Sequence, residues 1–273
     1  LWALALAADG DAILDRLAAK PKPWPLEPGS AKHICVIPIR DETGDINFYS
    51  LKRRFAEAAR RNADLIVLDI NSPGGPIGSS IRISNLIADH CKPDAKPPVV
   101  VYVSEWAISG GAMAALGCPT ILMNKHAQIG ASQPIMLTPG ADSKIAPAPE
   151  KIVSPTRAVF RTHAEQNGYP VALCEAMVDP EIGVSRLEIK DGPPVYVTHR
   201  EIEELKKSPF WERVTSEQVV NTPGKLLTLT AGEALRYGIA RKLVDNENEV
   251  IRFFGAQGAT VETLGFTRAE TFI

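Results

Sequence analysis

The strongest constraint on the fold is a pair of small-residue turns, each placed directly after a short apolar run. The first turn is Asp69-Ile70-Asn71-Ser72-Pro73-Gly74-Gly75, after the apolar run 65–68. The second turn is Trp106-Ala107-Ile108-Ser109-Gly110-Gly111-Ala112-Met113, after the run 99–103. Apolar runs of this length that end in a tight turn and lead into a helix are typical of buried strands. The sequence therefore predicts an α/β protein in which two adjacent strands end in glycine-rich turns.

The rest of the chain extends this alternation of strand and helix, which indicates parallel strands joined by crossover helices. In the first half we predict strands over 33–39, 65–70, 99–103, 120–123 and 128–130, and helices over 48–62, 78–91 and 110–116. The second half is mostly helical, with helices over 151–168, 171–177, 201–207, 228–237 and 246–256 and strand-like pieces over 181–189, 194–198 and 240–244. No shift in composition divides residues 32–273, so we expect one domain there.

Residues 1–31 differ from this pattern and are expected to form a leader and a Pro-rich linker. Ala5-Leu6-Ala7 has the small-x-small form of a signal-peptidase site, which predicts an exported protein, periplasmic or membrane-associated. The alternative is that residues 1–8 begin a helix that continues through 11–17. Prolines at 21, 23 and 25 extend the linker. No apolar run reaches the roughly 18–20 residues that a membrane-spanning helix needs.

Composition excludes several classes of function. The formal net charge is −2 and no basic cluster is present, which argues against a nucleic-acid partner. The four cysteines are widely spaced and form no Cys-x-x-Cys pair, so we expect neither a zinc site nor a redox motif. We therefore expect no metal and no cofactor.

The two turns carry the residue types needed for acyl transfer. A hydroxyl at Ser109 can attack a carbonyl, and the backbone amides of a Gly-Gly turn can hold the resulting oxyanion. The alternative for Ser109 is an ordinary helix N-cap, and the alternative for Gly74-Gly75 is a turn without function. Two such turns on adjacent strands favour a serine hydrolase.

A nucleophilic serine needs a base, and none of the five histidines lies next to an acidic residue that would orient it. They occupy positions 33, 90, 126, 163 and 199. A lysine can replace histidine where burial lowers its pKa. Lys151 opens a predicted helix after a Pro-rich loop, where the helix dipole disfavours a positive charge. The alternatives are that Lys151 is a solvated surface residue, or that Lys144 in the same loop is the base.

The order and spacing of several motifs resemble a known superfamily. They are Leu68-Asp69-Ile70-Asn71-Ser72-Pro73-Gly74-Gly75, Ser109-Gly110-Gly111, Gln128-Ile129-Gly130-Ala131-Ser132-Gln133-Pro134 and Ala148-Pro149-Glu150-Lys151-Ile152, followed by the stretches 176–179 and 227–235. Together they resemble the ClpP/crotonase superfamily, and within it the NfeD-type membrane-bound serine proteases, which are related to signal peptide peptidase A. The resemblance covers roughly residues 32–250.

This resemblance implies a ClpP/crotonase-like α/β fold, with repeated ββα units and a parallel sheet flanked by helices. It implies a serine endopeptidase with a Ser–Lys dyad, in which Ser109 is the nucleophile and Lys151 the general base. The backbone amides of Gly75 and Gly110 would form the oxyanion hole, with the substrate beside Gly74. The implied substrates are apolar segments of membrane-associated proteins, and we expect identical subunits to assemble.

Two other functions remain open for this fold. A crotonase-type acyl-CoA enzyme would share the oxyanion hole but would need catalytic carboxylates, and Glu105 is the only acidic residue near the second turn. A catalytically inactive member would serve as a binding or assembly module. Ser132 stands where ClpP itself would need a histidine, which favours the dyad over a Ser-His-Asp triad.

Overall fold

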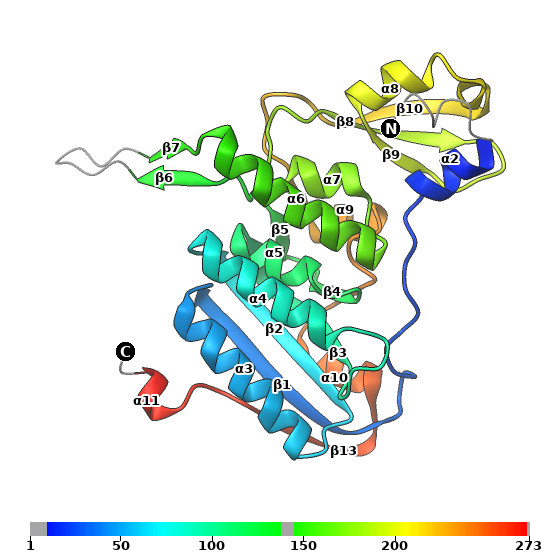
Figure 1. The fold of residues 1–273 in the computed structure, drawn as a ribbon. Coiled ribbons are helices and arrows are strands. Elements are labelled where there is room, and N and C mark those ends of the chain that lie inside the picture. The colour runs from blue at the N-terminus through cyan, green and yellow to red at the C-terminus, as the bar shows by residue number, and fades with distance from the viewer. Residues whose placement is uncertain (1–9, 138–144, 272–273) are drawn as a thin grey trace. The chain divides into compact units, whose positions relative to one another are not determined.

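The computed structural model describes residues 10–137, 145–271 of the chain, which divides into two compact units (Figure 1). Unit 1 comprises residues 1–20 and 133–227, and unit 2 comprises residues 21–132 and 228–273. The prediction of one domain over 32–273 stays a prediction. The proposed leader at residues 1–8 lies outside the described residues.

Unit 2 is built on an eight-stranded sheet. Its strands are β1 (Ala31–Glu42), β2 (Leu65–Gly74), β3 (Val99–Ile108), β4 (Ile121–Asn124), β5 (Gln128–Gly130), β11 (Thr228–Thr230), β12 (Lys242–Val244) and β13 (Gly255–Thr263). The main path runs β11-β5-β3-β2-β1-β13, with β4 beside β3 and β12 beside β4. Every pair is parallel except β11 with β5. The expected α/β fold with a parallel sheet flanked by helices is confirmed.

Helices cover both faces of this sheet. Helices α3 (Asp45–Arg60) and α4 (Ile77–His90) lie along one face, as Figure 1 shows, and α5 (Gly110–Leu116) follows β3. Helix α10 (Glu247–Phe254) contributes Val250 and Phe254 to a core cluster with the strands. Helix α9 (Ala231–Arg236) starts with a capping box formed by Thr230 and Glu233, because the first three residues of the predicted helix 228–237 form β11 instead.

The end of unit 2 differs from the prediction. The predicted helix 246–256 stops at Phe254, and β13 follows it as a parallel partner of β1. This strand is mostly exposed, so its sequence lacks the apolar alternation that predicts a strand. Pairing with β1 fixes the strand, because it satisfies backbone hydrogen bonds whatever the side chains are.

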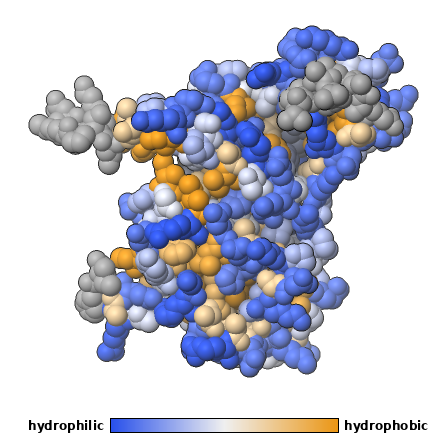
Figure 2. Space-filling model, in the orientation of Figure 1, coloured by the Kyte–Doolittle hydropathy of each residue, from blue (hydrophilic) through white to orange (hydrophobic). Residues whose placement is uncertain are grey.

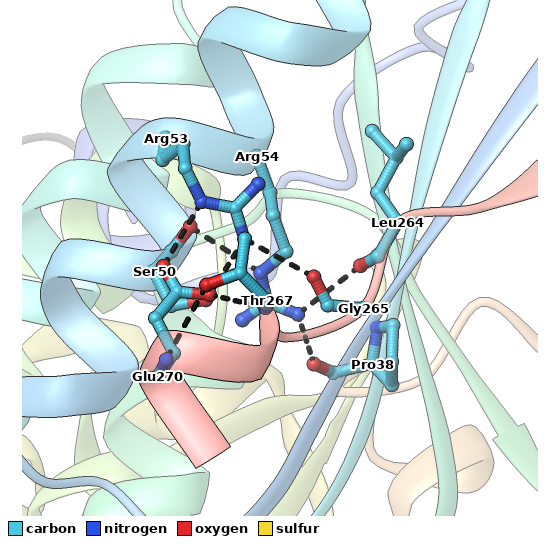
Figure 3. Close-up of polar contacts among 8 residues, drawn as sticks. All are labelled: Pro38, Ser50, Arg53, Arg54, Leu264, Gly265, Thr267 and Glu270. Carbon is cyan, nitrogen blue, oxygen red and sulfur yellow. Dashed lines mark hydrogen bonds and ion pairs between the residues drawn. The ribbon is translucent and has the colours of Figure 1, made fainter. Parts of the chain in front are cut away.

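The C-terminal segment of unit 2 is anchored on α3 (Figure 3). Arg53 donates to both carboxylate oxygens of Glu270, at 2.9 and 2.7 Å, next to the short helix α11 (Arg268–Thr271). Arg54 is fully buried and donates to the carbonyl of Pro38 at 2.6 Å. Burial lowers the pKa of Arg54 to about 10. The guanidinium groups thus join α3, β1 and the C-terminal segment.

Unit 1 combines a three-stranded antiparallel sheet, a hairpin and several helices. The sheet has the order β10-β8-β9, from β10 (Val214–Asn221), β8 (Val184–Ile189) and β9 (Val195–Thr198). The hairpin pairs β6 (Ile135–Leu137) with β7 (Ile145–Pro147). The helices are α2 (Gly10–Leu17), α6 (Glu150–Asn167), α7 (Val171–Ala176), α8 (His199–Leu205) and the 3-10 turn η1 (Pro209–Arg213).

The hairpin and β10 were absent from the sequence prediction. Strand β10 is exposed along most of its length, so its side chains alternate too weakly to predict a strand. Among the helices formed by the described residues, none has the length and apolar character needed to cross a membrane.

Candidate active site

The two glycine-rich turns meet at one edge of the unit 2 sheet. Strands β2 and β3 are parallel neighbours, and Ser72 pairs with Ala107 near their carboxyl ends. A Cβ atom added to Gly74 would lie 2.5 Å from Cβ of Ser109 and 2.8 Å from the amide nitrogen of Gly110. The turns are therefore in direct contact, and only a glycine at position 74 leaves room for the Ser109 side chain.

Ser109 has a backbone conformation that L-residues rarely adopt. Its φ is 54° and its ψ is −120°. Residues held in such a conformation store strain of order 1–3 kcal/mol, and they cluster at functional sites. The strained turn leads directly from β3 into α5. Ser109 is thus placed at a sharp strand-to-helix turn with its side chain beside Gly74.

The hydroxyl of Ser109 has no hydrogen-bond partner among the described residues. Ser109 occupies the N-cap position of α5, but its side chain makes no capping hydrogen bond. Among the described residues its Oγ has no other hydrogen-bond partner either. The alternative interpretation of Ser109 as a capping serine is therefore wrong, because a cap requires the side-chain oxygen to accept from the helix.

Two backbone amides are available beside this hydroxyl. The carbonyl of Ser109 accepts from the Met113 amide at 3.1 Å and from Ser132 Oγ at 3.3 Å. The carbonyl of Gly74 accepts from the Thr43 amide at 2.8 Å. The carbonyl of Ser109 shares a peptide unit with the amide of Gly110, and the carbonyl of Gly74 shares one with the amide of Gly75. Because the C=O and N–H of a trans peptide point in opposite directions, both amides are directed away from the groups that donate to these carbonyls. Neither amide donates to another described residue.

The sequence analysis did not assign three further residues to this site. Thr43 and Ser80 are buried, and their hydroxyl oxygens would lie 2.4 and 2.2 Å from a Cβ atom on Gly110. Ser132 was considered only as a replacement for a histidine, but its hydroxyl contacts the backbone of Ser109. Thr43 directly follows β1, so the end of a third strand lies beside the other two, which only the strand pairing reveals.

Lys151 lies in unit 1, at the second residue of α6, and its side chain is exposed. Within the described part of the chain it makes no ion pair or side-chain hydrogen bond. Its neighbour Glu150 pairs instead with Arg157, at 2.9 Å. Ser109 belongs to unit 2, and its pairing with Lys151 stays a prediction. Lys144, the alternative base, lies outside the described residues.

One statement about the histidines needs correction. His33 does have an acidic partner, because its Nε2 lies 3.0 Å from a carboxylate oxygen of Glu262. This contact was not predictable from local sequence, since Glu262 belongs to the unpredicted strand β13. His33 nevertheless lies near the start of β1, at the opposite end of the sheet from the turns. Among the described residues no group of three or more His, Cys, Asp or Glu side chains is placed to hold a metal.

The fold is that of a protease domain of known structure. The 1510-N membrane-bound stomatin-specific protease, in a mutant form in complex with a substrate peptide, has a TM-score of 0.60 and 19% identity, covering 89% of this chain and 96% of that chain. The 1510-N membrane protease from Pyrococcus horikoshii, specific for a stomatin homolog, has a TM-score of 0.55 and 18% identity, covering 89% and 96%. At these identities the likeness shows a shared fold alone.

Residues 33–214 match the family described as NfeD1b, N-terminal domain, and the chain belongs to this family. "Membrane protein NfeD1b" of Bacillus subtilis is 27% identical over 230 residues, which is 84% of this chain and 42% of that protein. "Membrane-bound protease PH1510" of Pyrococcus horikoshii is 28% identical over 181 residues, which is 65% of this chain and 40% of that protein. The chain thus spans less than half the length of these two relatives.

Proposed function

We propose that this chain is a serine endopeptidase in which Ser109 is the nucleophile and Lys151 the general base. The observation that carries the proposal is the strained, uncapped Ser109 beside two free backbone amides. Among the described residues this hydroxyl neither caps its helix nor bonds a neighbour, which leaves it available for chemistry. The family and the relative named as a protease support the same chemistry.

The proposed reaction follows from these groups. The Lys151 amine accepts the proton of the Ser109 hydroxyl as Oγ attacks the scissile carbonyl. The amides of Gly75 and Gly110 stabilise the tetrahedral oxyanion, while Gly74 leaves space for an extended substrate. The protonated lysine then gives its proton to the leaving amine. Water hydrolyses the acyl-enzyme, with Lys151 again accepting the proton.

We propose apolar segments of membrane-associated proteins as substrates. The hairpin of β6 and β7 exposes Ile135, Met136 and Ile145, with 54%, 46% and 68% of their surfaces accessible. In Figure 2 hydrophobic residues appear where this hairpin leaves the body of unit 1. The Ala148 amide bonds the Pro134 carbonyl at 2.9 Å and closes the hairpin just before α6, which carries Lys151. An apolar surface next to the proposed base suits an apolar peptide.

The localisation of the protein and its assembly from identical subunits are also proposals. The names of the two relatives, a membrane protein and a membrane-bound protease, support a membrane-associated protein. Export rests on the small-x-small motif at residues 5–7 alone. Assembly of identical subunits is part of the same proposal. No observation favours an acyl-CoA enzyme, because Glu105 is exposed and accepts a hydrogen bond from Asn71 at 2.9 Å.

Substituting the lysine tests the dyad. Lys151→Arg should reduce turnover of a quenched fluorescent apolar peptide by about 100-fold or more, because a guanidinium stays charged and cannot accept the proton. Lys190→Arg is the matched control, since Lys190 is also exposed in unit 1 and has no ion pair among the described residues. Normal turnover by Lys151→Arg would reject Lys151 and make Lys144 the next candidate. A wild-type protein that cleaves no peptide would instead indicate a binding module.

A further inference from the structure

We infer that Thr43 is a positioning residue for the oxyanion site, acting through a chain of hydroxyl groups that fixes the Gly75 peptide. The inference rests on the proposed function and extends it to a residue that would not touch the substrate. Thr43 is fully buried, and it follows β1, the strand next to β2. The carboxyl ends of β1, β2 and β3 therefore supply Thr43, Gly75 and Gly110 in turn.

The hydroxyl chain has a defined direction. Ser80 Oγ donates to the carbonyl of Pro76 at 2.9 Å. Thr43 Oγ1 and Ser80 Oγ are 2.7 Å apart. Because a hydroxyl carries one hydrogen, and that of Ser80 goes to Pro76, the Thr43 hydroxyl must donate to Ser80. The chain therefore runs from Thr43 through Ser80 to the residue directly after Gly75.

Thr43 also holds the residue before Gly75. Its amide donates to the Gly74 carbonyl at 2.8 Å, in the same peptide plane as the Gly75 amide. The carbonyls of Gly74 and Pro76 are thus fixed by one residue, directly on one side and through Ser80 on the other. Rotation of the Gly75 amide away from the oxyanion position would break at least one of these bonds.

The same hydroxyl pair touches the second oxyanion glycine. A Cβ atom on Gly110 would lie 2.2 Å from Ser80 Oγ and 2.4 Å from Thr43 Oγ1, so the pair packs directly against the Gly110 α-carbon. A Cβ atom on Gly75 would lie 2.8 Å from the Thr43 amide nitrogen. Thr43 and Ser80 therefore set the spacing between the two turns that bear the proposed oxyanion donors.

The hydroxyl of Thr43 is tested by Thr43→Val, which keeps the shape of the side chain but leaves Ser80 without its donor. Thr43→Ser keeps the donor and removes a methyl group. Thr120→Val is the matched control, because Thr120 is a buried threonine of unit 2 whose hydroxyl has no partner among the described residues. Each variant is compared with wild type for its rate of labelling by a fluorophosphonate, its affinity for a peptide aldehyde and its thermal midpoint.

We expect Thr43→Val to label about 10- to 100-fold more slowly, because a small misplacement of one oxyanion donor costs this much. Affinity for the aldehyde, whose adduct carries the oxyanion, should fall in parallel, while KM for the peptide stays within about threefold. Thr43→Ser should restore labelling to within about threefold of wild type, and Thr120→Val should leave it unchanged. A purely structural role would move the thermal midpoint without this parallel loss.

Several results would overturn the inference. One is a folded Thr43→Val that labels at the wild-type rate, and another is a Thr43→Ser as slow as Thr43→Val. If Thr43→Val does not fold, Ser80→Ala breaks the same chain, and normal labelling of folded Ser80→Ala would refute the role. Failure of both variants to fold would make the pair structural. A wild-type protein that never labels would refute the proposed function itself, which separates the two failures.

Discussion

The two units differ in how their proposed catalytic groups are held. In unit 2, Ser109 and its neighbouring amides are fixed by buried strand ends, and Gly74, Thr43 and Ser132 contact them closely. In unit 1, Lys151 is an exposed residue at the start of a helix, without an ion-pair partner among the described residues. The proposed nucleophile and oxyanion donors are thus held by packing within unit 2, whereas no described contact fixes the side chain of the proposed base.

The largest expected effect tests whether unit 2 holds a nucleophile under strain. Ser109→Ala should reduce peptide turnover by about 10⁴-fold or more. Ser109→Gly should be equally inactive but more stable than Ser109→Ala by about 1 kcal/mol, because glycine adopts a positive φ without strain. Turnover and urea midpoints measured on both variants would decide this. Equal stability of the two variants would show that the turn stores no strain.

The next prediction concerns the space that unit 2 reserves for the nucleophile. Gly74 has a φ of 103°, and a Cβ atom there would lie 2.5 Å from that of Ser109. Gly74→Ala should therefore lower fluorophosphonate labelling by about 100-fold and also lower the thermal midpoint. Gly232→Ala is a suitable control, because a Cβ atom there would meet nothing within 4 Å. Wild-type labelling by Gly74→Ala would contradict the close contact of the two turns.

Acidification should destabilise unit 1, because it protonates His163 in α6. Burial lowers the pKa of this histidine to about 4, whereas an unfolded histidine titrates near 6.5. The unfolded state therefore binds the proton first, and the stability of unit 1 should fall as the pH drops from about 6.5 to about 4. The loss is on the order of 3 kcal/mol, with no change above pH 7. His163→Asn should abolish this dependence, which hydrogen exchange of the α6 amides would measure.

The matched control for that experiment is His126→Asn, since His126 is an exposed residue of unit 2. It should leave the acid dependence of α6 as it is in wild type. If wild-type α6 amides exchange equally at pH 7 and pH 5, the proposed acid sensitivity of unit 1 is wrong.

The smallest expected effect concerns the ion pair between Arg53 and Glu270 at the C-terminal end of unit 2. Hydrogen bonds from Arg53 lower the pKa of Glu270 to about 2. The carboxylate therefore contributes stability above the unfolded pKa of about 4.3, and this contribution disappears as the pH falls toward 2. Glu270→Gln should cost less than about 1 kcal/mol at pH 7, because the Arg53 side chain is partly exposed. Denaturant unfolding of wild type and Glu270→Gln at pH 7 and pH 3 would measure the difference in stability between them. A difference that is larger at pH 3 than at pH 7 would contradict the prediction.

The same contrast between units explains how much the sequence could predict. In unit 2 the buried strands carry continuous apolar runs, so the first residues of β2 and β3 and both ends of the helix after Ser109 were predicted where they are observed. Both strands continue beyond their apolar runs, to Gly74 and Ile108. Exposed strands such as β10 and β13 lack that pattern and were missed. Their pairing is a property of the tertiary fold, which local sequence does not encode.

The candidate site shows a similar division. Ser109, Gly75 and Gly110 were predictable because their small-residue turns follow recognisable strands. Thr43 was not, because a single threonine after a strand carries no signal until the ends of β1 and β2 are placed side by side. The fixed direction of the Gly75 and Gly110 amides also required the hydrogen bonds of the carbonyls before them.

The most direct test of the central claim is to map the site of covalent labelling in the wild-type protein. The protein is treated with a fluorophosphonate at neutral pH, digested and examined by peptide mass spectrometry. We predict a single phosphonylated residue, Ser109, because its hydroxyl is uncapped and the amides of Gly75 and Gly110 have no acceptor among the described residues. An unlabelled Ser109 in a folded protein, or a label on a different serine, would contradict the assignment of this turn as the nucleophile.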